Sequence, residues 1–222
     1  MEESETEVQS PDELFLTAVV FEIALGLLAL FLGWSLGPDA RAMIPKVDSS
    51  EIWPIVNQVL WGLLATVPLL VFIEIVRRIP CEPVRELERL GEDGMMKSLL
   101  SLSPAEMVVI SLCAGIGEEL LFRGWLLYWL EGLYGRLFSV DAGSTAALVA
   151  ALIVSSIAFG LVHPITKLYI VLAAIMGLYF GGLVIWTGSL LVPITAHAAY
   201  DAVQMILTSW LNKRKAAQPH SG

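Results

Sequence analysis

Charged residues are scarce in this sequence of 222 residues, and their scarcity excludes an ordinary soluble domain. Only 16% of the residues are charged and 56% are hydrophobic, against roughly 25% and 45–50% in soluble globular proteins. Several apolar runs approach the roughly 20 residues that a helix needs to cross a bilayer. Long apolar runs, rather than short alternating segments, favour helices over a barrel. The composition therefore predicts an all-α fold, a polytopic transmembrane helix bundle.

Cysteine is nearly absent, and the beginning of the chain lacks basic residues. Cys81 follows a helix end and Cys113 lies inside an apolar run, so no disulfide framework is expected. The first residues are acidic and the run from Leu14 to Trp34 is longer than a signal-peptide core, so we expect it to be retained as the first span. Much of the net charge of −9 belongs to this acidic tail.

We expect no nucleic-acid partner for a chain of this charge and composition.

Six apolar segments are separated by short polar or Gly/Pro-bearing pieces. We expect about six spans, at 14–36, 52–76, 104–131, 145–163, 166–187 and 189–211. The amphipathic stretch 83–90 either lies along the membrane interface or is a solvated connecting helix. The chain then divides into an acidic tail (1–13), two spans with a connecting segment (14–103), a core (104–211) and a basic tail (212–222).

The distribution of Lys and Arg predicts the orientation of an integral, multi-pass membrane protein. Nine of them fall on the side of the N-terminus and three on the other side: Arg77, Arg78, Arg85, Arg89, Lys97, Lys167, Lys213, Arg214 and Lys215 against Arg41, Lys46 and Arg136. The positive-inside rule then places both termini in the cytosol. In a bacterium the membrane would be the plasma membrane.

The stretch from Gly117 to Gly124 carries three ionised side chains within an apolar run. A charge at the centre of a membrane helix costs at least about 2.5–3.5 kcal/mol, so these residues need a partner or a task. On a helix Glu119 and Arg123 are i,i+4 neighbours, whereas Glu118 is turned about 100° away from Glu119. Glu119 can pair with Arg123 while Glu118 points elsewhere. A structural ion pair between helices is the alternative interpretation.

Three further polar residues lie inside apolar runs. His163 precedes Pro164 at a helix end, and His197 and Asp201 share one helix face at i,i+4. A single histidine in such a run is more often a hydrogen-bonded core residue than a catalyst. Together, however, the ionisable groups predict one shared polar chamber.

Hydrolysis is the chemistry that such a chamber favours. A glutamate beside a histidine can act as general base for water, and a histidine held by an acidic or amide side chain can stabilise an oxyanion. The same side chains, Glu118, His163 and His197, are also compatible with a zinc site that keeps one position open for water. The residue pattern does not choose between glutamate-dependent and metal-dependent hydrolysis.

The order of these blocks resembles the CPBP family of intramembrane proteases, which includes type II CAAX prenyl endopeptidases, Abi proteins and bacteriocin-processing proteins. The family pattern, Glu-Glu-x-x-x-Arg, Phe-x-x-x-His and His-x-x-x-Asn or Asp, corresponds to Glu118-Glu119 with Arg123, Phe159 with His163, and His197 with Asp201. The resemblance covers roughly residues 104–205.

The resemblance implies a role for each motif residue. Glu118 would activate water with His163, while His197 and Asp201 would stabilise the oxyanion. Glu119 and Arg123 would hold the site together, and Phe159 would pack beside it. The third block often ends in Asn in the eukaryotic prenyl proteases, where this chain has Asp201. An ionised Asp would repel an oxyanion, so Asp201 would instead orient His197 or carry a proton.

The resemblance also implies a substrate class. The substrate would be a peptide or protein in or at the bilayer, lipidated in the CAAX case, or a leader or sorting peptide. A proton-coupled transporter and a non-catalytic membrane scaffold, both using the same polar cluster, remain the alternatives. A transporter would require paired inverted repeats or broken helices, and the sequence shows no convincing repeat.

Two features do not fit simply. At about 1.5 Å per residue Glu118 lies some 20 Å beyond Pro104, whereas His163 falls near the cytosolic end of its span. For these two side chains to meet, either the third helix begins well before the lipid or the boundaries of the spans shift. Glu22 is an intramembrane acid without an evident partner, whereas Glu74 can pair with Arg77 or Arg78. Glu22 either faces the bundle or marks an error of register in the first span.

Overall fold

Helices make up the regular structure of the described part of the chain. The computed structural model describes residues 10–46, 51–91, 94–139, 141 and 143–217. In chain order the helices are α1 (Pro11–Leu36), α2 (Trp53–Arg77), α3 (Glu82–Arg89), α4 (Gly94–Ser101), α5 (Pro104–Glu119), the π-helix η1 (Leu120–Leu126), α6 (Leu127–Phe138), α7 (Thr145–Leu161), α8 (Lys167–Thr187) and α9 (Leu191–Ala217). The predicted all-α helix bundle is confirmed. Of the two predicted tails, residues 1–9 and 218–222 lie outside the described residues.

Each predicted span coincides with a helix, but the helices differ in how well they suit a bilayer. By length and composition α1, α2 and α8 can cross a membrane, and α4 with the helix Pro104–Phe138, bent by 116°, counts as a fourth span if taken together. The apolar α7 has only 17 residues. The polar residues His197, Asp201 and Gln204 lower the hydropathy of α9. Two of the residues that lower the hydropathy of α9, His197 and Asp201, thus belong to the predicted polar chamber.

Capping boxes fix the beginning of two helices. The Ser10 hydroxyl accepts a hydrogen bond from the Glu13 amide, and the Glu13 carboxylate accepts one from the Ser10 amide. Ser103 and Glu106 repeat the arrangement at the start of α5. Both devices satisfy amides that the first helical turn leaves free. For this reason α1 begins at Pro11, three residues before the predicted span.

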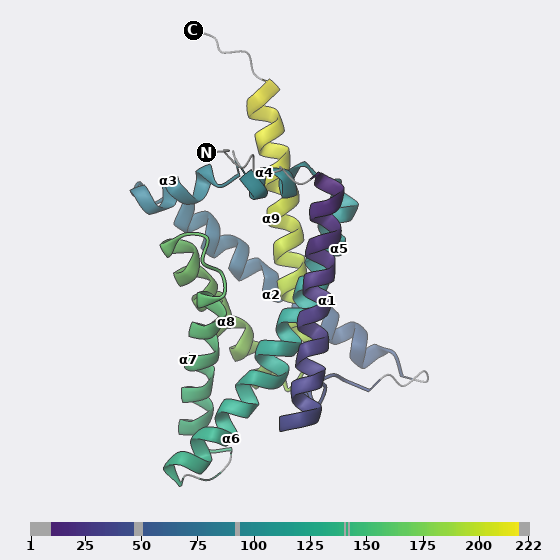
Figure 1. Ribbon diagram of the computed structural model, residues 1–222, viewed down its shortest axis with the longest axis vertical. Coiled ribbons are helices and arrows are strands. Elements are labelled where there is room, and N and C mark those ends of the chain that lie inside the picture. Colours follow the sequence, from purple (N-terminus) through teal and green to yellow (C-terminus); the bar gives the residue numbers. More distant parts are fainter. Residues whose placement is uncertain (1–9, 47–50, 92–93, 140, 142, 218–222) are drawn as a thin grey trace, which may run out of the picture.

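The helices form a bundle around α5 (Figure 1). Helix α5 packs against α1 on one side and α9 on the other, α2 packs against α9, and α7 packs against α8 and α6. Helix α1 begins, and α9 ends, at the same end of the bundle, where α3 and α4 also lie. This arrangement agrees with an even number of crossings between the two ends. The cytosolic location of that end remains a prediction.

The amphipathic stretch forms α3, which lies across the end of the bundle above α8 (Figure 1). Val84 is buried in the core and Leu87 packs against the same cluster. The charged face is exposed, and hydrogen bonds from Arg85 lower the pKa of Glu82 below its ordinary value. Exposed pairs of this kind contribute little stability, so α3 is attached mainly by its apolar face. Helix α4 was not predicted.

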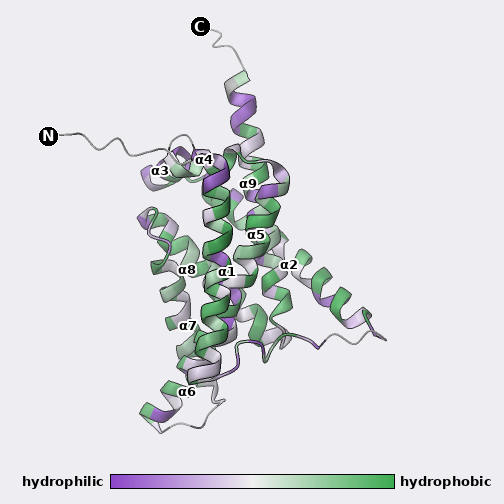
Figure 2. Cartoon of the chain, turned by 45° about the vertical axis from the view of Figure 1, so that its right-hand side comes forward, coloured by the Kyte–Doolittle hydropathy of each residue, from purple (hydrophilic) through white to green (hydrophobic). Residues whose placement is uncertain are grey.

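Apolar side chains cover the outside of the long helices (Figure 2). Leu16, Leu27, Leu63, Ile75 and Ile153 are all more than two-fifths exposed. Hydrophilic residues concentrate in α3 and at the far end of α9. A soluble protein does not expose apolar surface of this extent, and the surface therefore suits contact with lipid. With the candidate spans, it identifies an integral membrane protein.

Small residues let the helices around α5 approach one another closely. A Cβ at Gly117 would collide with the Glu22 carbonyl oxygen and lie 3.1 Å from the Glu22 carbonyl carbon on α1. A Cβ at Gly115 would lie 2.9 Å from the Ile194 carbonyl oxygen on α9. Backbone approach at small residues is a usual means of helix association in membranes. It brings both neighbours against the turn of α5 that carries Glu118.

We predict that Gly117→Ala destabilises the bundle, because its methyl group must displace the backbone of α1 at Glu22. Gly182→Ala on α8 is the matched control, since a Cβ there meets no atom within 4 Å. The measurement is thermal unfolding of the purified proteins in detergent. We expect a lower midpoint for Gly117→Ala and an unchanged or slightly higher one for Gly182→Ala, because alanine favours a helix over glycine by about 1 kcal/mol. Equal midpoints would contradict the close crossing of α1 and α5.

Candidate active site

A π-helical segment interrupts the long helix at the centre of the bundle. Helix α5 ends at Glu119, η1 covers Leu120–Leu126 and α6 continues to Phe138. Such π segments are rare and frequently occur at functional sites. Here the segment begins directly after Glu118-Glu119 and contains Arg123, so three charged residues lie at one irregularity of the backbone.

The Glu119 carboxylate joins two helices. Its Oε1 accepts hydrogen bonds from Arg123 Nη1 at 2.7 Å and from His197 Nδ1 at 2.9 Å. Glu119 and Arg123 are 0% and 2% exposed. The predicted i,i+4 pair is therefore present, and it also reaches α9. Because a buried charge is tolerated only when it is paired, the three side chains fix the relation between α5 and α9.

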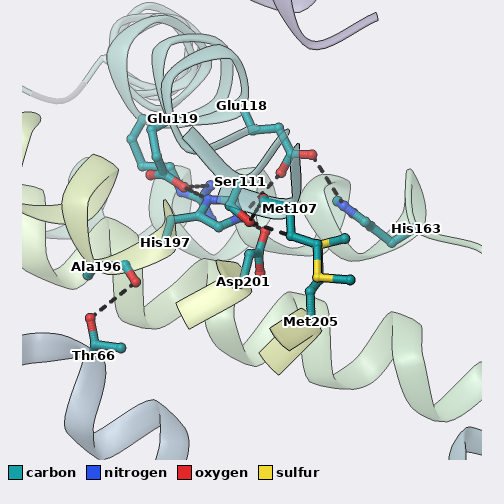
Figure 3. A network of polar contacts seen from close by, with 11 residues as sticks. Thr66, Met107, Ser111, Glu118, Glu119, His163, Ala196, His197, Asp201 and Met205 are labelled. Atoms are coloured by element: carbon teal, nitrogen blue, oxygen red, sulfur yellow. Dashed lines mark hydrogen bonds and ion pairs between the residues drawn. The ribbon is translucent and has the colours of Figure 1, made fainter. Parts of the chain in front are cut away.

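Glu118 points away from that pair and toward His163 (Figure 3). Glu118 Oε1 lies 3.6 Å from His163 Nε2, and Glu118 Oε2 lies 3.8 Å from His197 Nε2. His163 Nδ1 lies 2.7 Å from the carbonyl oxygen of Phe159. A carbonyl oxygen only accepts hydrogen bonds, so Nδ1 carries the proton and donates it. In the neutral ring Nε2 then presents a lone pair to Glu118.

His197 has carboxylates at both ring nitrogens. Besides the contact of its Nδ1 with Glu119, its Nε2 lies 3.3 Å from Asp201 Oδ2, one turn further along α9. The predicted i,i+4 pair of His197 and Asp201 is therefore present as well. Figure 3 shows His197 between Glu119 and Asp201, with Thr66 reaching the neighbouring Ala196 carbonyl. With a proton on each nitrogen, His197 can donate to both carboxylates.

Aromatic rings enclose the charged groups. The Arg123 guanidinium carbon lies 4.1 Å from the centroid of the Phe159 ring, so Phe159 packs beside the site as the resemblance implied. The Phe180 ring stacks on His197 with centroids 4.8 Å apart and planes 16° from parallel. Sequence reasoning missed Phe180, because a phenylalanine in an apolar span carries no distinguishing signal.

The relative depth of Glu118 and His163 follows from unequal helix lengths. Helix α7 has 17 residues and ends at Leu161, and the turn between α7 and α8 lies nearer the middle of the bundle than the start of α5 does (Figure 1). Helix α5 begins beside α3 and α4, beyond that turn. The expectation that the third helix begins early is thus met, and Glu118 and His163 lie at the same level.

Two other intramembrane acids have different surroundings. Glu74 forms an exposed pair with Arg78 at 3.0 Å, as predicted. Glu22 faces the bundle: Glu118, His197, Asp201 and His163 all act on its carboxyl electrostatically. The register of the first span was therefore correct, and Glu22 lies next to the site. In the sequence, the only indication that Glu22 lies near the site is an acidic residue without an evident partner inside an apolar run.

The residues expected to be compatible with zinc do not form a metal site in this arrangement. Within the part of the chain that the structure describes, no group of three or more His, Cys, Asp or Glu side chains is placed to hold a metal ion. Both nitrogens of His197 face carboxylates that it can bind directly.

A cluster of three carboxylates, two imidazoles and a guanidinium, buried or half-buried inside a helical bundle, defines a class: polytopic membrane proteins with ionisable groups gathered inside the bundle. The family model for type II CAAX prenyl endopeptidase Rce1-like proteins matches residues 100–203, somewhat less than half of the chain. All seven motif residues lie within the match. Residues 100–203 are thus similar to the CAAX-type intramembrane proteases of this family model, and the predicted resemblance is confirmed. No curated protein and no solved structure matches the chain.

We predict that Glu119→Ala lowers the free energy of unfolding by about 3 kcal/mol, because it leaves Arg123 buried without its carboxylate and releases His197 from α5. The matched control is Glu74→Ala, which removes an exposed i,i+4 pair and changes stability by less than about 1 kcal/mol. Reversible unfolding in mixed micelles measures both. Equal losses in the two variants would show that the buried contacts do not hold α5 and α9 together.

Proposed function

We propose that the protein is an intramembrane endopeptidase in which Glu118 and His163 activate water. The observation that carries the proposal is the pair of facing acceptors at 3.6 Å, Glu118 Oε1 and His163 Nε2. In the neutral ring, the hydrogen bond from His163 Nδ1 to Phe159 leaves Nε2 without a proton of its own. A water molecule between them donates one hydrogen atom to each, which satisfies both acceptors.

The reaction then needs only groups of this chain, water and the peptide. The water oxygen attacks the carbonyl carbon of the scissile bond while Glu118 takes one of its protons. The carbonyl oxygen becomes an oxyanion in the tetrahedral intermediate. When the carbon–nitrogen bond breaks, Glu118 returns the proton to the leaving amine. The products are a carboxylic acid and an amine, which then exchange a proton to become carboxylate and ammonium, and Glu118 ends in its original state.

We assign stabilisation of the oxyanion to His197, oriented by Asp201. A doubly protonated His197 carries positive charge and lies 3.8 Å from Glu118, next to the place where the water is activated. Because both of its N–H groups face carboxylates, His197 would act on the oxyanion through its positive charge, and preorganised charge has large effects on rates in enclosed sites. An ionised Asp201 would repel an oxyanion in direct contact. Its distance of 3.3 Å from His197 Nε2 instead supports an orienting role.

Glu119 and Arg123 support the site and do not take part in proton transfer. Glu119 Oε1 is bound to both Arg123 and His197, so a proton on this carboxylate would weaken the contacts that hold α5 and α9 together. The proposed substrate is a peptide or protein segment that reaches the cluster from the membrane or the cytosol. A C-terminal CAAX-type tail and a leader or sorting peptide both belong to this class.

We predict that Glu118→Gln or His163→Ala lowers peptide hydrolysis by at least about 100-fold, because the first removes the base that takes the proton of the water and the second removes the other acceptor that binds the water. Membranes that contain the protein or its Glu118→Gln variant are compared for peptides cut only by the former, and the cleaved peptide is then assayed with purified protein. The Glu74→Gln variant, whose acid lies in an exposed pair, should cleave normally. All variants should accumulate in the membrane to the same level. Unchanged turnover in Glu118→Gln, or proton-coupled flux without cleavage, would remove the basis of the proposal.

We predict that hydrolysis survives metal chelators, because Glu118, His163 and His197 act through hydrogen bonds in the proposed mechanism. The assay uses the same purified protein after prolonged incubation with 1,10-phenanthroline and dialysis. The expected rate equals that of the untreated protein. A loss of activity that zinc restores would assign the water activation to a metal instead.

A further inference from the structure

Glu22 is a sheltered acid beside the site that the proposed reaction does not use. Its Oε2 is buried, and among the described residues no group forms a hydrogen bond with it. It lies on α1, outside the matched domain of residues 100–203. The α1 backbone at Glu22 meets the α5 backbone at Gly117, the residue before Glu118. The first span therefore places a carboxylate next to the proposed base.

A groove opens on the outside of the bundle at the same point. Its lining comes from α1 and α5 and includes Glu22, Gly26, Leu27, Cys113, Ile116 and Gly117. Leu27 and Ile116 are 60% and 46% exposed on the surface that suits lipid. Apart from Glu22 the lining is apolar or small. The groove thus runs from the lipid-facing surface to a carboxylate within electrostatic reach of Glu118 and His197.

In the part of the chain that the structure describes, no arginine or lysine forms a hydrogen bond with Glu22 Oε2. The buried Arg123 is bound to Glu119, and Arg78 is bound to Glu74 at the end of α2. An acceptor of this kind in an apolar groove calls for a hydrogen-bond donor from a ligand, since an unsatisfied polar group in lipid is unfavourable.

The donors that arrive with a membrane peptide are its backbone amides. In an intact transmembrane helix the amide groups are already hydrogen-bonded within the helix. A segment that is unwound for hydrolysis exposes its N–H groups, while its apolar side chains still prefer an apolar surface. The groove offers both features, an apolar wall and one acceptor beside the proposed base.

We propose that the groove between α1 and α5 binds an extended, apolar segment of the substrate peptide, and that Glu22 accepts a hydrogen bond from a backbone N–H of that segment. This inference rests on the proposed protease function. It makes Glu22 a substrate-binding residue and gives α1 a part in the site.

The experiment measures peptide binding without cleavage. A photoreactive benzoylphenylalanine replaces Leu27 in the groove or, as a matched control, Ile153 on the lipid-facing side of α7. Both proteins also carry Glu118→Gln, which prevents cleavage, and both are reconstituted in proteoliposomes. The probe is a synthetic, membrane-spanning apolar peptide interrupted by Pro-Gly, compared with an uninterrupted Leu/Ala helix. We expect crosslinks from position 27 to the interrupted peptide. Adding Glu22→Leu should reduce their yield about tenfold, the effect of losing one hydrogen bond to a charged acceptor. Glu22→Gln, which keeps a carbonyl acceptor, should reduce it less.

Three outcomes would each overturn the inference. They are equal crosslinking yields for the two peptides, equal crosslinking yields from positions 27 and 153, and a crosslinking yield that does not change when residue 22 is substituted. In the active protein, Glu22→Leu should raise the KM for the cleaved peptide about tenfold with a smaller change in kcat. Cleavage at an unchanged KM would overturn the inference and leave the protease function intact. Crosslinking at position 27 without any hydrolysis by the active protein would instead refute the protease function alone. Accumulation and thermal stability of the Glu22→Leu protein are measured in parallel.

Discussion

The hydrogen bonds from Arg123 and His197 to one oxygen of Glu119 are the constraint on which the site depends. They join η1 and α9 through three buried side chains, so neither helix can rotate without leaving a charge unpaired in an apolar interior. Because Glu119 is held by Arg123 and His197, its neighbour Glu118 is the carboxylate outside this group of three. The helical offset of about 100° between adjacent residues then directs Glu118 to the opposite side, where His163 lies.

Helix lengths and small residues bring the remaining parts to this level of the bundle. Helix α7 is short and ends near the middle of the bundle, so the histidine that follows it meets the middle of the long α5–α6 helix. The glycines at 115 and 117 allow α9 and α1 to approach the same turn of α5 from two sides. Glu118 is therefore surrounded by three other segments: α1, the end of α7 and α9. A larger residue at either glycine would move one of them away.

Much of the fold and of the candidate cluster could be predicted from the sequence because both depend on local spacing. Apolar runs and their breaks located the long helices, and i,i+4 spacing identified Glu119 with Arg123 and His197 with Asp201. The contact of Glu118 with His163 depends on the relative depth of two helices, which spacing alone does not determine. Phe180 stacks on His197 from α8, an apolar span in which the sequence does not distinguish one apolar residue from another as a neighbour of the site. The environment of Glu22 depends on how α1 crosses α5, which only the folded bundle determines.

The two histidines differ in a way that favours a division of roles. His163 has one nitrogen committed to a backbone carbonyl and the other facing Glu118, so in the neutral ring its lone pair can accept a hydrogen bond from the water that Glu118 deprotonates. His197 has an acidic group at each nitrogen and is enclosed by Phe180, so its protons are held and its orientation is fixed. A group that positions water must present a lone pair, whereas a group that stabilises an oxyanion must keep its charge. Their hydrogen-bond partners therefore suit His163 to the first task and His197 to the second.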